Sequence, residues 1–281
     1  MAGDPERIGL TTSETGMYTF EYQQPKTLAD AGAALARSGG KPLAGGQSLV
    51  AAMKLRLAQP GTLVDLAGLP ELKGIRKEGN ALVIGAMTRH ADAANSPVLQ
   101  QLLPGLASVP ASVGDPQVRN RGTIGGSIAN NDPNADYPAA CLGLGATIIT
   151  NKRRIAADDF FTGMFSTALE DGEIITKISF PVAKKAAYEK FKHPASGFAL
   201  VGVFVSKRGS DIRVAVTGAG ANGVFRVKSF EEALKKRFAA KSLEGMTIPA
   251  TGMNTDIHAS PEYRAHLVGV LARRALAKAT A

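Results

Sequence analysis

Two long apolar runs in the C-terminal third constrain the fold of this chain most strongly. The runs "FALVGVFVS" (198–206) and "IRVAVTGAG" (212–220) are rich in β-branched residues and flank the turn-rich segment "KRGSD". Apolar runs of this length joined by a short loop containing glycine predict two strands of a hairpin. The fold therefore contains antiparallel strands.

Several other stretches show helical or strand patterns. "TLADAGAALARSG" (27–39) places its apolar residues on one helical face and ends at Gly39, a usual helix stop. "SPVLQQLLPGLASV" (96–109) begins with Ser96 and Pro97 and predicts a helix interrupted near Pro104. Three short runs bounded by turn residues predict strands: "TLVDLAGL" (62–69), "ALVIGAM" (81–87) and "ATIIT" (146–150).

The sequence pattern of the C-terminal part of the chain predicts helices. "SFEEALKKRF" (229–238) predicts a helix that begins with a capping box from Ser229 to Glu232, and "SPEYRAHLVGVLARRALAKA" (260–279) predicts a long helix. Helices and strands are mixed along the chain without a regular strand–helix–strand alternation. This organisation predicts an α+β fold.

Length and composition predict a globular protein with room for two domains. The chain has 281 residues, 44% hydrophobic residues and a mean hydropathy near zero (−0.01). The stretch "MAGDPERIGLTTSETG" lacks the apolar core of a secretory signal. No uncharged apolar stretch reaches the roughly 18–20 residues of a membrane helix. We therefore expect a cytoplasmic protein that is not integral to a membrane.

The thiol and imidazole groups argue against a metal site in this chain. Cys141 is the only cysteine, which excludes an internal disulfide and a thiolate-held iron–sulfur cluster within this chain. It lies in the apolar segment "AACLGLGA", which predicts a buried and unreactive thiol. The four histidines show no ligand spacing, so no protein metal site is expected.

Positive charge is concentrated in the C-terminal hundred residues. Residues 182–281 hold 17 Lys and Arg against 7 Asp and Glu, a net charge of +10, whereas residues 1–181 have a net charge of −1. The composition shifts near "SFPVAKKAAYEKFKH" (179–193), which suggests a domain boundary there. The cations are dispersed, with few aromatic residues between them. This pattern favours a solvated face or a protein-binding surface over nucleic-acid binding.

Two stretches match functional motifs in part, but the residues around them lack features that each motif requires. "GAGANG" (218–223) matches the dinucleotide fingerprint G-x-G-x-x-G, but the β-like segment "VFRVKSF" follows where a helix N-terminus is needed. "GQSLV" (46–50) lacks the second glycine of a nucleophile elbow and has no accompanying histidine constellation. The Ser48 hydroxyl is therefore better explained as a hydrogen-bond donor.

Two glycine pairs have similar surroundings, in "AGGQSLV" (44–50) and "TIGGSIAN" (123–130). Glycine permits positive φ and a close backbone approach, and successive free N–H groups can form a nest for an anion. With the hydroxyls of Ser48, Thr123 and Ser127 alongside, the two loops could each hold one phosphate of a diphosphate. Ordinary tight turns remain the alternative explanation from these residues alone.

The residues around the glycine pairs resemble a known family. "KPLAGGQSLV", "LVDLAGLPEL", "IGAMTRHADAANSPVL", "PQVRNRGTIGGSIANNDPNADYPAA", "ADDFFTGMFSTALEDGEIITKISFP" and "AYEKFK" occur in this order. This set resembles the FAD-binding medium subunit of the molybdenum hydroxylases, the family of aerobic carbon monoxide dehydrogenase and xanthine dehydrogenase. The resemblance covers nearly the whole chain and is closest to the carbon monoxide dehydrogenase type.

The resemblance implies a two-domain architecture. Residues 1–181 would form an FAD-binding domain of the vanillyl-alcohol-oxidase-like (PCMH) type, made of two subdomains around the flavin. Residues 182–281 would form a C-terminal domain of the carbon monoxide dehydrogenase flavoprotein type, with a three-stranded antiparallel sheet and helices.

The resemblance also implies cofactor-binding residues. The two glycine loops would contact the FAD diphosphate, Asp136 the ribose–adenine side and Lys190 the isoalloxazine end, with Thr88 close to the flavin. Phe198 stands where the family has an aromatic residue over the flavin, although a core position in the strand explains it equally well. A solvated side chain is the alternative for Lys190. The complete set is Ala44, Gly45, Gly46, Gln47, Ser48, Leu49, Thr88, Thr123, Ile124, Gly125, Gly126, Ser127, Asp136, Lys190 and Phe198.

Two positions depart from the family pattern. Gln47 replaces a histidine that is common in the carbon monoxide dehydrogenase type, and Phe198 lacks the hydroxyl of a tyrosine. A hydrogen bond made by that hydroxyl would be absent here.

The function implied by the resemblance is electron transfer within a larger complex. A large subunit would carry the molybdopterin, a small subunit would carry [2Fe–2S] clusters, and FAD would be held here, in a dimer of heterotrimers. No catalytic acid or base is expected on this chain, because its task is to position the flavin. Two alternatives stand beside this one: a self-contained flavin-dependent oxidoreductase acting on a small molecule, and a basic scaffold or nucleic-acid-binding protein.

Overall fold

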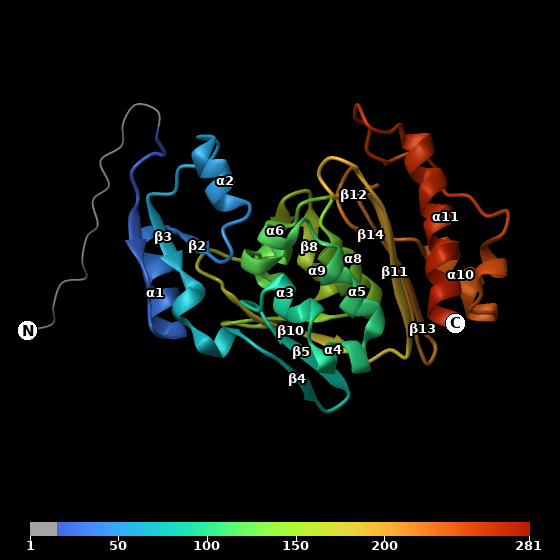
Figure 1. Ribbon diagram of the computed structural model, residues 1–281, viewed down its shortest axis with the longest axis horizontal. Helices are drawn as coiled ribbons and strands as arrows, with labels where there is room; N and C mark the ends of the chain where they lie inside the picture. Colours follow the sequence, from blue (N-terminus) through green and yellow to red (C-terminus); the bar gives the residue numbers. More distant parts are fainter. Residues whose placement is uncertain (1–15) are drawn as a thin grey trace, which may run out of the picture.

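The computed structural model describes residues 16–281, which form three sheet-containing units side by side (Figure 1). The start of the first expected domain, and most of the stretch in which no secretory signal was found, lie outside the described residues. The N-terminal unit carries a small parallel sheet, whereas the central and C-terminal units are built on antiparallel sheets.

The N-terminal unit alternates strands and helices. Its sheet has the order β1-β3-β2, with the strands β1 (Glu21–Gln23), β2 (Lys41–Leu43) and β3 (Thr62–Asp65) and the helices α1 (Leu28–Ser38) and α2 (Leu49–Lys54). The Thr27 side chain caps α1 by accepting from the N–H of Asp30, and Gly39 ends the helix at φ 58°. The predicted helix at residues 27–39 is therefore confirmed.

The central unit is a five-stranded antiparallel sheet covered by helices. The strand order is β4 (Ile75–Glu78), β5 (Ala81–Gly85), β10 (Ile175–Pro181), β6 (Thr147–Thr150) and β7 (Arg154–Ala156). The helices are α3 (His90–Ala94), α4 (Pro97–Leu102), α5 (Pro104–Ser112), α6 (Pro116–Arg121), α7 (Ile124–Asn130), α8 (Asp136–Leu144) and α9 (Ala157–Phe160), followed by the hairpin β8 (Phe161–Gly163) and β9 (Ser166–Thr167). The predicted interruption near Pro104 is the junction of α4 and α5, and Ser96 caps α4.

A buried carboxylate ties the β6–β7 turn to the segment that leads into β10. Glu173 accepts hydrogen bonds from Thr150 Oγ1 at 2.7 Å, Arg153 Nε at 3.0 Å and the Glu170 N–H at 2.8 Å. Burial alone would raise the pKa of Glu173, but the bonds from Arg153, Glu170 and Thr150 outweigh it and lower this pKa from about 4.5 to about 2.

This shift predicts an acid-dependent loss of stability. Because the folded-state pKa lies below the unfolded value, the contribution of Glu173 is complete above pH 4.5 and disappears as the pH falls toward 2. We expect Glu173→Gln to be less stable than the wild type at pH 7 and to show a shallower decline in unfolding free energy between pH 4.5 and 2. Urea denaturation at a series of pH values measures both quantities, and parallel pH profiles for the two proteins would contradict the assignment.

The C-terminal unit is a four-stranded antiparallel sheet between two helical layers. Its strands are β11 (Lys185–Lys192), β12 (Ala199–Arg208), β13 (Asp211–Thr217) and β14 (Phe225–Arg226), in that order. Helices α10 (Lys228–Lys236) and α11 (Pro261–Thr280) pack against the sheet from the side opposite α8 (Figure 1). The predicted β12–β13 hairpin and C-terminal helix are confirmed.

The sheet has one strand more than the three that the resemblance implied. After the glycine-rich turn at residues 218–223, the chain returns to pair Phe225 with Val216 and Arg226 with Ala215. The same return confirms that no helix starts at "GAGANG", so the dinucleotide-fingerprint interpretation is excluded by the structure.

The predicted capping box at Ser229 is wrong. Helix α10 begins at Lys228, and no side chain caps its N-terminus. Instead, the buried carboxylate of Glu231 accepts hydrogen bonds from the Val214 N–H at 3.0 Å and from Arg226 Nε at 2.8 Å. These tertiary bonds to β13 and β14, rather than a local cap, accompany the start of the helix.

The single cysteine is buried, as expected. Cys141 is fully buried in α8 within the central core, and burial raises the pKa of its thiol. Within residues 16–281 no helix is both long and apolar enough to cross a bilayer. The same residues contain no group of three or more histidine, cysteine, aspartate or glutamate side chains suited to holding a metal ion.

Candidate cofactor site

The two glycine loops touch each other. A Cβ atom added to Gly45 would lie 2.3 Å from the Arg121 carbonyl oxygen and 2.7 Å from Gly122 Cα. A Cβ atom added to Gly126 would lie 3.4 Å from the Ala44 Cβ atom. Segments far apart in the sequence thus meet backbone to backbone, and glycine at position 45 is what allows this approach.

The first loop presents unpaired backbone donors. Within the described residues, the N–H groups of Gly45, Gly46, Gln47 and Ser48 have no hydrogen-bond partner. Gly46 adopts φ 72°, a conformation that favours glycine, and Ser48 makes no capping bond to α2. The Gln47 amide donates back to the Gly45 carbonyl at 3.0 Å. Such a run of free donors at the surface suits an anionic oxygen-rich ligand.

The second loop has a different structure from the one expected. Residues 123–130 form the cap and length of helix α7, and the N–H groups of its first turn are occupied. Those of Ile124 and Gly125 bond the carbonyls of Thr88 and Ala86, at 3.2 and 2.8 Å. Those of Gly126 and Ser127 bond Thr123, through its hydroxyl and its carbonyl. The expectation of two equivalent nests of free N–H groups is therefore wrong.

The second loop instead contributes close backbone packing and a side-chain hydroxyl. A Cβ atom on Gly125 would lie 2.6 Å from the Ala86 Cβ atom, so this glycine lets α7 pack closely on the segment after β5. The Ser127 hydroxyl has no hydrogen-bond partner among the described residues. Leu49 and Ile124 each follow a loop as the first residue of α2 and α7, and Ile124 is fully buried.

Thr88 is buried and its hydroxyl is engaged. Its Oγ1 atom lies 3.0 Å from the Gly74 N–H and 3.2 Å from the Gly74 carbonyl oxygen, and its own carbonyl accepts from Ile124. These contacts link the segment before β4 to the start of α7. Thr88 therefore orders the backbone beside the loops.

A neutral histidine lies under the second loop. A Cβ atom on Gly122 would lie 2.7 Å from His90 Nε2, and His90 Nδ1 is 3.3 Å from the Tyr137 hydroxyl. Burial, and then the nearby Arg119 cation, lower the pKa of His90 to about 4. The ring is therefore uncharged at neutral pH and acts as a packing surface for Gly122.

Asp136 and Lys190 form one buried ion pair. Lys190 Nζ lies 3.0 Å from both carboxylate oxygens of Asp136 and 2.9 Å from the Ser112 carbonyl oxygen. The Tyr188 hydroxyl donates to Asp136 at 2.6 Å. The two charged side chains are only 4% and 3% exposed. Burial raises the pKa of Asp136 and lowers that of Lys190, each opposed by the attraction of its partner.

This pair changes two of the sequence-based interpretations. Lys190 is not a solvated surface lysine. The resemblance assigned Asp136 and Lys190 to different ends of the cofactor, and atoms 3.0 Å apart do not support that division. The two residues instead act as a unit that joins α8 to β11, with α5 contributing the Ser112 carbonyl.

Phe198 lies on the surface, outside the core of the sheet. It precedes β12 in a loop where Gly197 adopts φ 70°, and its carbonyl accepts from the His193 N–H at 2.8 Å. Its side chain is 48% exposed, so the strand-core explanation is wrong. The ring is free to stack on a planar ligand.

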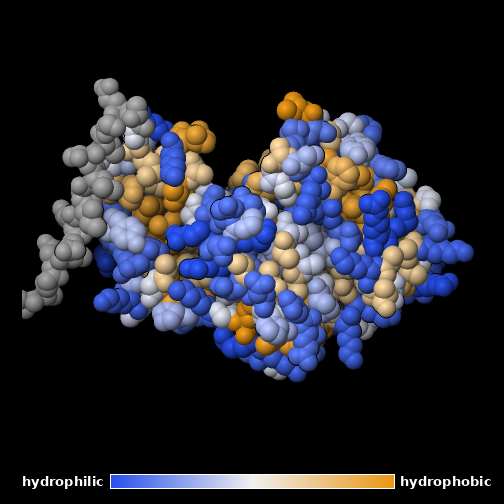
Figure 2. Space-filling model, in the orientation of Figure 1, coloured by the Kyte–Doolittle hydropathy of each residue, from blue (hydrophilic) through white to orange (hydrophobic). Residues whose placement is uncertain are grey.

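The surface has two hollows in this part of the molecule, and the first of them is lined by the first glycine loop. The first, about 200 Å³, is lined by Leu43, Ala44, Gly45, Gly46, Gln47, Val50, Asp65, Ala67 and Arg121. Figure 2 shows a notch in the upper outline of the molecule, above the central unit and between the N-terminal unit, which carries α2, and the C-terminal unit. The presence of a hollow directly on the first loop agrees with its free N–H groups.

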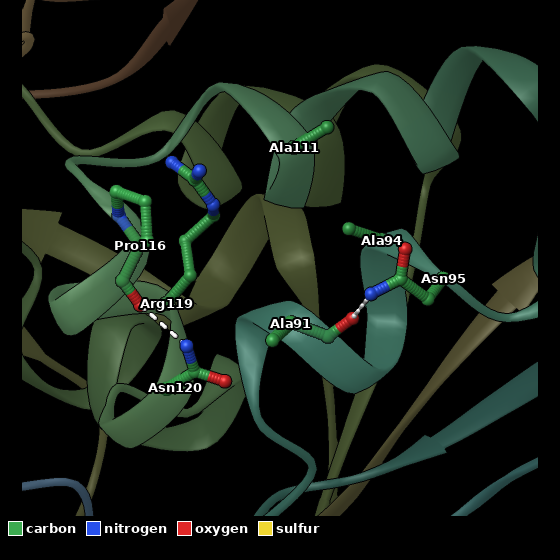
Figure 3. Close-up of a pocket in the computed structure, with 7 residues that line it drawn as sticks. All are labelled: Ala91, Ala94, Asn95, Ala111, Pro116, Arg119 and Asn120. Atoms are coloured by element: carbon green, nitrogen blue, oxygen red, sulfur yellow. Dashed lines mark hydrogen bonds between the residues drawn. The ribbon is translucent and has the colours of Figure 1, made fainter.

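The second hollow lies among α3, α5 and α6. It measures about 340 Å³ and is lined by Ala91, Ala94, Asn95, Ala111, Pro116, Arg119 and Asn120 (Figure 3). The amides of Asn95 and Asn120 donate to the Ala91 and Pro116 carbonyls on their own helices, as Figure 3 shows. Its polar side chains are thus largely engaged with the protein.

Sequence reasoning missed Arg121, which lies on the wall of the first hollow. The signal was present in the cationic "RNRG" (119–122) directly before "TIGG". It also missed Tyr188 and the Ser112 carbonyl, for which the sequence carries no local signal because they pair with Asp136 and Lys190 across 52 and 78 residues.

Comparison with known families identifies the chain. Residues 18–183 match the family model described as "FAD binding domain in molybdopterin dehydrogenase", and residues 186–279 match "CO dehydrogenase flavoprotein C-terminal domain". These matches define a flavoprotein component of an oxidoreductase. The chain belongs to the family of FAD-binding domains of molybdopterin dehydrogenases.

Individual relatives span the chain almost completely. The carbon monoxide dehydrogenase medium chain of Hydrogenophaga pseudoflava is 38% identical and covers 92% of this chain and 96% of its own length. The nicotine 6-hydroxylase medium subunit of Paenarthrobacter nicotinovorans is 35% identical, with coverages of 93% and 98%. Solved structures include the Hydrogenophaga enzyme, with a TM-score of 0.82 at 38% identity and coverages of 93% and 97%. Another is quinoline 2-oxidoreductase from Pseudomonas putida 86, with a TM-score of 0.79 at 28% identity and coverages of 94% and 97%.

These findings confirm the resemblance, the α+β two-part fold and FAD as the cofactor. The residues present fit such a group. The contact at Gly45 leaves no room for a side chain, and the loop that contains Gly45 carries N–H groups without a partner among the described residues and lines a hollow.

Proposed function

We propose that this chain is the FAD-binding electron-transfer subunit of a heterotrimeric molybdenum hydroxylase. The observation that supports it best is the contact between the two glycine loops beside a run of unpaired N–H groups. Bound FAD supplies the ability to accept electrons singly and to release them in pairs. The chain's own residues bind this group, orient it and shield it.

The proposed binding residues are two loops and four accessory residues. Ala44 to Leu49 contributes backbone donors to the diphosphate, and Thr123 to Ser127 contributes hydroxyls and close packing. Phe198 covers one face of the flavin ring. The Asp136–Lys190 pair holds α5, α8 and β11 together beside the ring, while Thr88 orders the backbone next to α7.

The partners are inferred from the relatives and from the residues of this chain. The relatives are named "medium chain" and "medium subunit", so each works with other chains. A single cysteine cannot hold an iron–sulfur cluster. We therefore assign the [2Fe–2S] clusters to a small subunit and the molybdopterin to a large subunit, in a dimer of heterotrimers located in the cytoplasm.

The boundary between the two functional parts is proposed near Pro181. Residues 1–181 would carry the FAD site, and residues 182–281 would add the β11–β14 sheet and the Lys190 and Phe198 contacts. Substrate choice is assigned to the large subunit, because the names of relatives with similar medium chains refer to carbon monoxide, nicotine and glyceraldehyde.

Native purification from the source cells tests this proposal. We expect the chain to copurify with a large and a small subunit, in a complex that contains molybdenum, iron and one FAD per copy of this chain. Metal analysis, flavin extraction and subunit stoichiometry measure these quantities. A lone flavoprotein that oxidises a small molecule by itself would instead support the self-contained oxidoreductase.

A further inference from the structure

Among the described residues, Arg121 is a cation without a partner, at the edge of the hollow beside the first glycine loop. It ends helix α6, is exposed, and contributes to the lining of the 200 Å³ hollow together with the first glycine loop. Within residues 16–281 its guanidinium makes no hydrogen bond and no ion pair. All five of its N–H donors are therefore available to a ligand.

Its neighbour on the same helix is in a different situation. Arg119 donates to the carbonyls of Val113 and Gly114, at 2.9 and 3.2 Å, and lines the other hollow. Arg119 therefore holds the backbone before α6 in place, whereas the guanidinium of Arg121 is free, within the described residues, beside the first glycine loop.

The backbone of Arg121 is held in place from two sides. Its carbonyl oxygen would lie 2.3 Å from a Cβ atom on Gly45, so it packs directly against the first loop. The next residue, Gly122, packs on the buried ring of His90 and donates its N–H to the Val118 carbonyl at 2.7 Å. The long side chain therefore extends from a fixed point on the wall of the hollow.

The hollow is lined by one carboxylate as well as by Arg121. Asp65 also lines it, and its carboxylate is fixed by the Tyr22 hydroxyl at 2.5 Å, Gln24 Nε2 at 3.0 Å and the Ala67 N–H at 2.9 Å. The hydrogen bond to Asp65 raises the pKa of Tyr22 to about 12, so that hydroxyl remains a donor. Without Arg121 the charged lining of the hollow would be one carboxylate, which repels a diphosphate.

We propose that Arg121 binds the diphosphate of FAD and supplies the positive charge of that site. This inference rests on the proposed function, since it names a further residue of the same site. The backbone donors of Gly45 to Ser48 fix the position of the phosphate oxygens, and the guanidinium neutralises their charge and offsets Asp65. Arg121 thereby makes binding depend on the diphosphate and not on the flavin ring alone.

The test compares ligands with and without phosphate on variants of the full chain. We would strip the flavin and titrate wild type, Arg121→Ala, Arg121→Lys and Arg37→Ala with FAD and with riboflavin, following flavin fluorescence. Arg37 is an exposed arginine of α1, and its replacement makes the same change in net charge. Thermal melts of each variant establish that the fold is retained.

We expect Arg121→Ala to bind FAD at least about tenfold more weakly, and riboflavin with unchanged affinity. Arg121→Lys should fall between Arg121→Ala and the wild type, Arg37→Ala should match the wild type, and added salt should weaken FAD binding more in the wild type than in Arg121→Ala. Equal FAD affinities for wild type and Arg121→Ala would overturn this inference and leave the proposed function standing. A wild-type chain that binds no FAD, alone or in its native complex, would contradict both.

Discussion

Replacing Asp136 with alanine is expected to lower the free energy of unfolding by about 3–5 kcal/mol, because it leaves the Lys190 ammonium buried without its counter-charge. The same change removes the acceptor of the Tyr188 hydroxyl. Urea denaturation of the flavin-free protein at pH 7 measures the difference. Asp159→Ala is the control, since Asp159 is exposed and has no hydrogen-bond or ion-pair partner in the described part of the chain.

A double replacement distinguishes the cost of leaving a buried charge unpaired from the cost of losing side-chain packing. Lys190→Met alone should also destabilise, because it leaves the Asp136 carboxylate buried with only the Tyr188 hydroxyl. Combining Asp136→Ala with Lys190→Met should cost less than the sum of the two single changes, since no charge is then left unpaired. Strict additivity, or a cost below about 1 kcal/mol for Asp136→Ala, would show that the pair is not the buried unit described here.

The second large effect is expected at the contact between the loops. In Gly45→Ala the new methyl group would meet the Arg121 carbonyl oxygen at 2.3 Å and Gly122 Cα at 2.7 Å. Both are backbone atoms that cannot rotate away, and overpacking of this kind costs about 1–3 kcal/mol. Because the proposed bound state needs the loops in contact, we expect FAD to bind about 10- to 100-fold more weakly.

The chain offers a matched control for that change. Among the described residues, no atom beyond its two chain neighbours lies within 4 Å of a Cβ atom added to Gly61, which does not adopt positive φ. Gly61→Ala should therefore leave FAD affinity unchanged. Flavin fluorescence titration compares the two variants under one set of conditions. Equal affinities for Gly45→Ala and Gly61→Ala would show that the approach of the loops is not needed for binding.

The elements that sequence reasoning predicted correctly are those with local signals. Thr27 and Gly39 mark both ends of α1, Ser96 caps α4, and Ser260 accepts from the Tyr263 N–H at the start of α11. Each signal acts within four residues along the chain, so it can be read without knowing the tertiary structure.

The failures involve contacts between distant segments. The N–H groups of Ile124 and Gly125 are occupied by the carbonyls of Thr88 and Ala86, in the segment after β5. The pairing of Asp136 with Lys190 spans 54 residues, and Glu231 finds its partner on β13. For the site, the sequence located both glycine loops but could not show that, among the described residues, only the first has a run of free backbone N–H groups.

Titration of the flavin-stripped chain with FAD is the most direct test of the proposed diphosphate site. We infer that the Ala44–Leu49 loop, held against Arg121–Gly122, binds the diphosphate of one FAD molecule. We expect one FAD molecule bound per chain, with riboflavin binding more weakly and inorganic pyrophosphate competing with FAD. Binding of riboflavin as tight as that of FAD, with no competition by pyrophosphate, would contradict it.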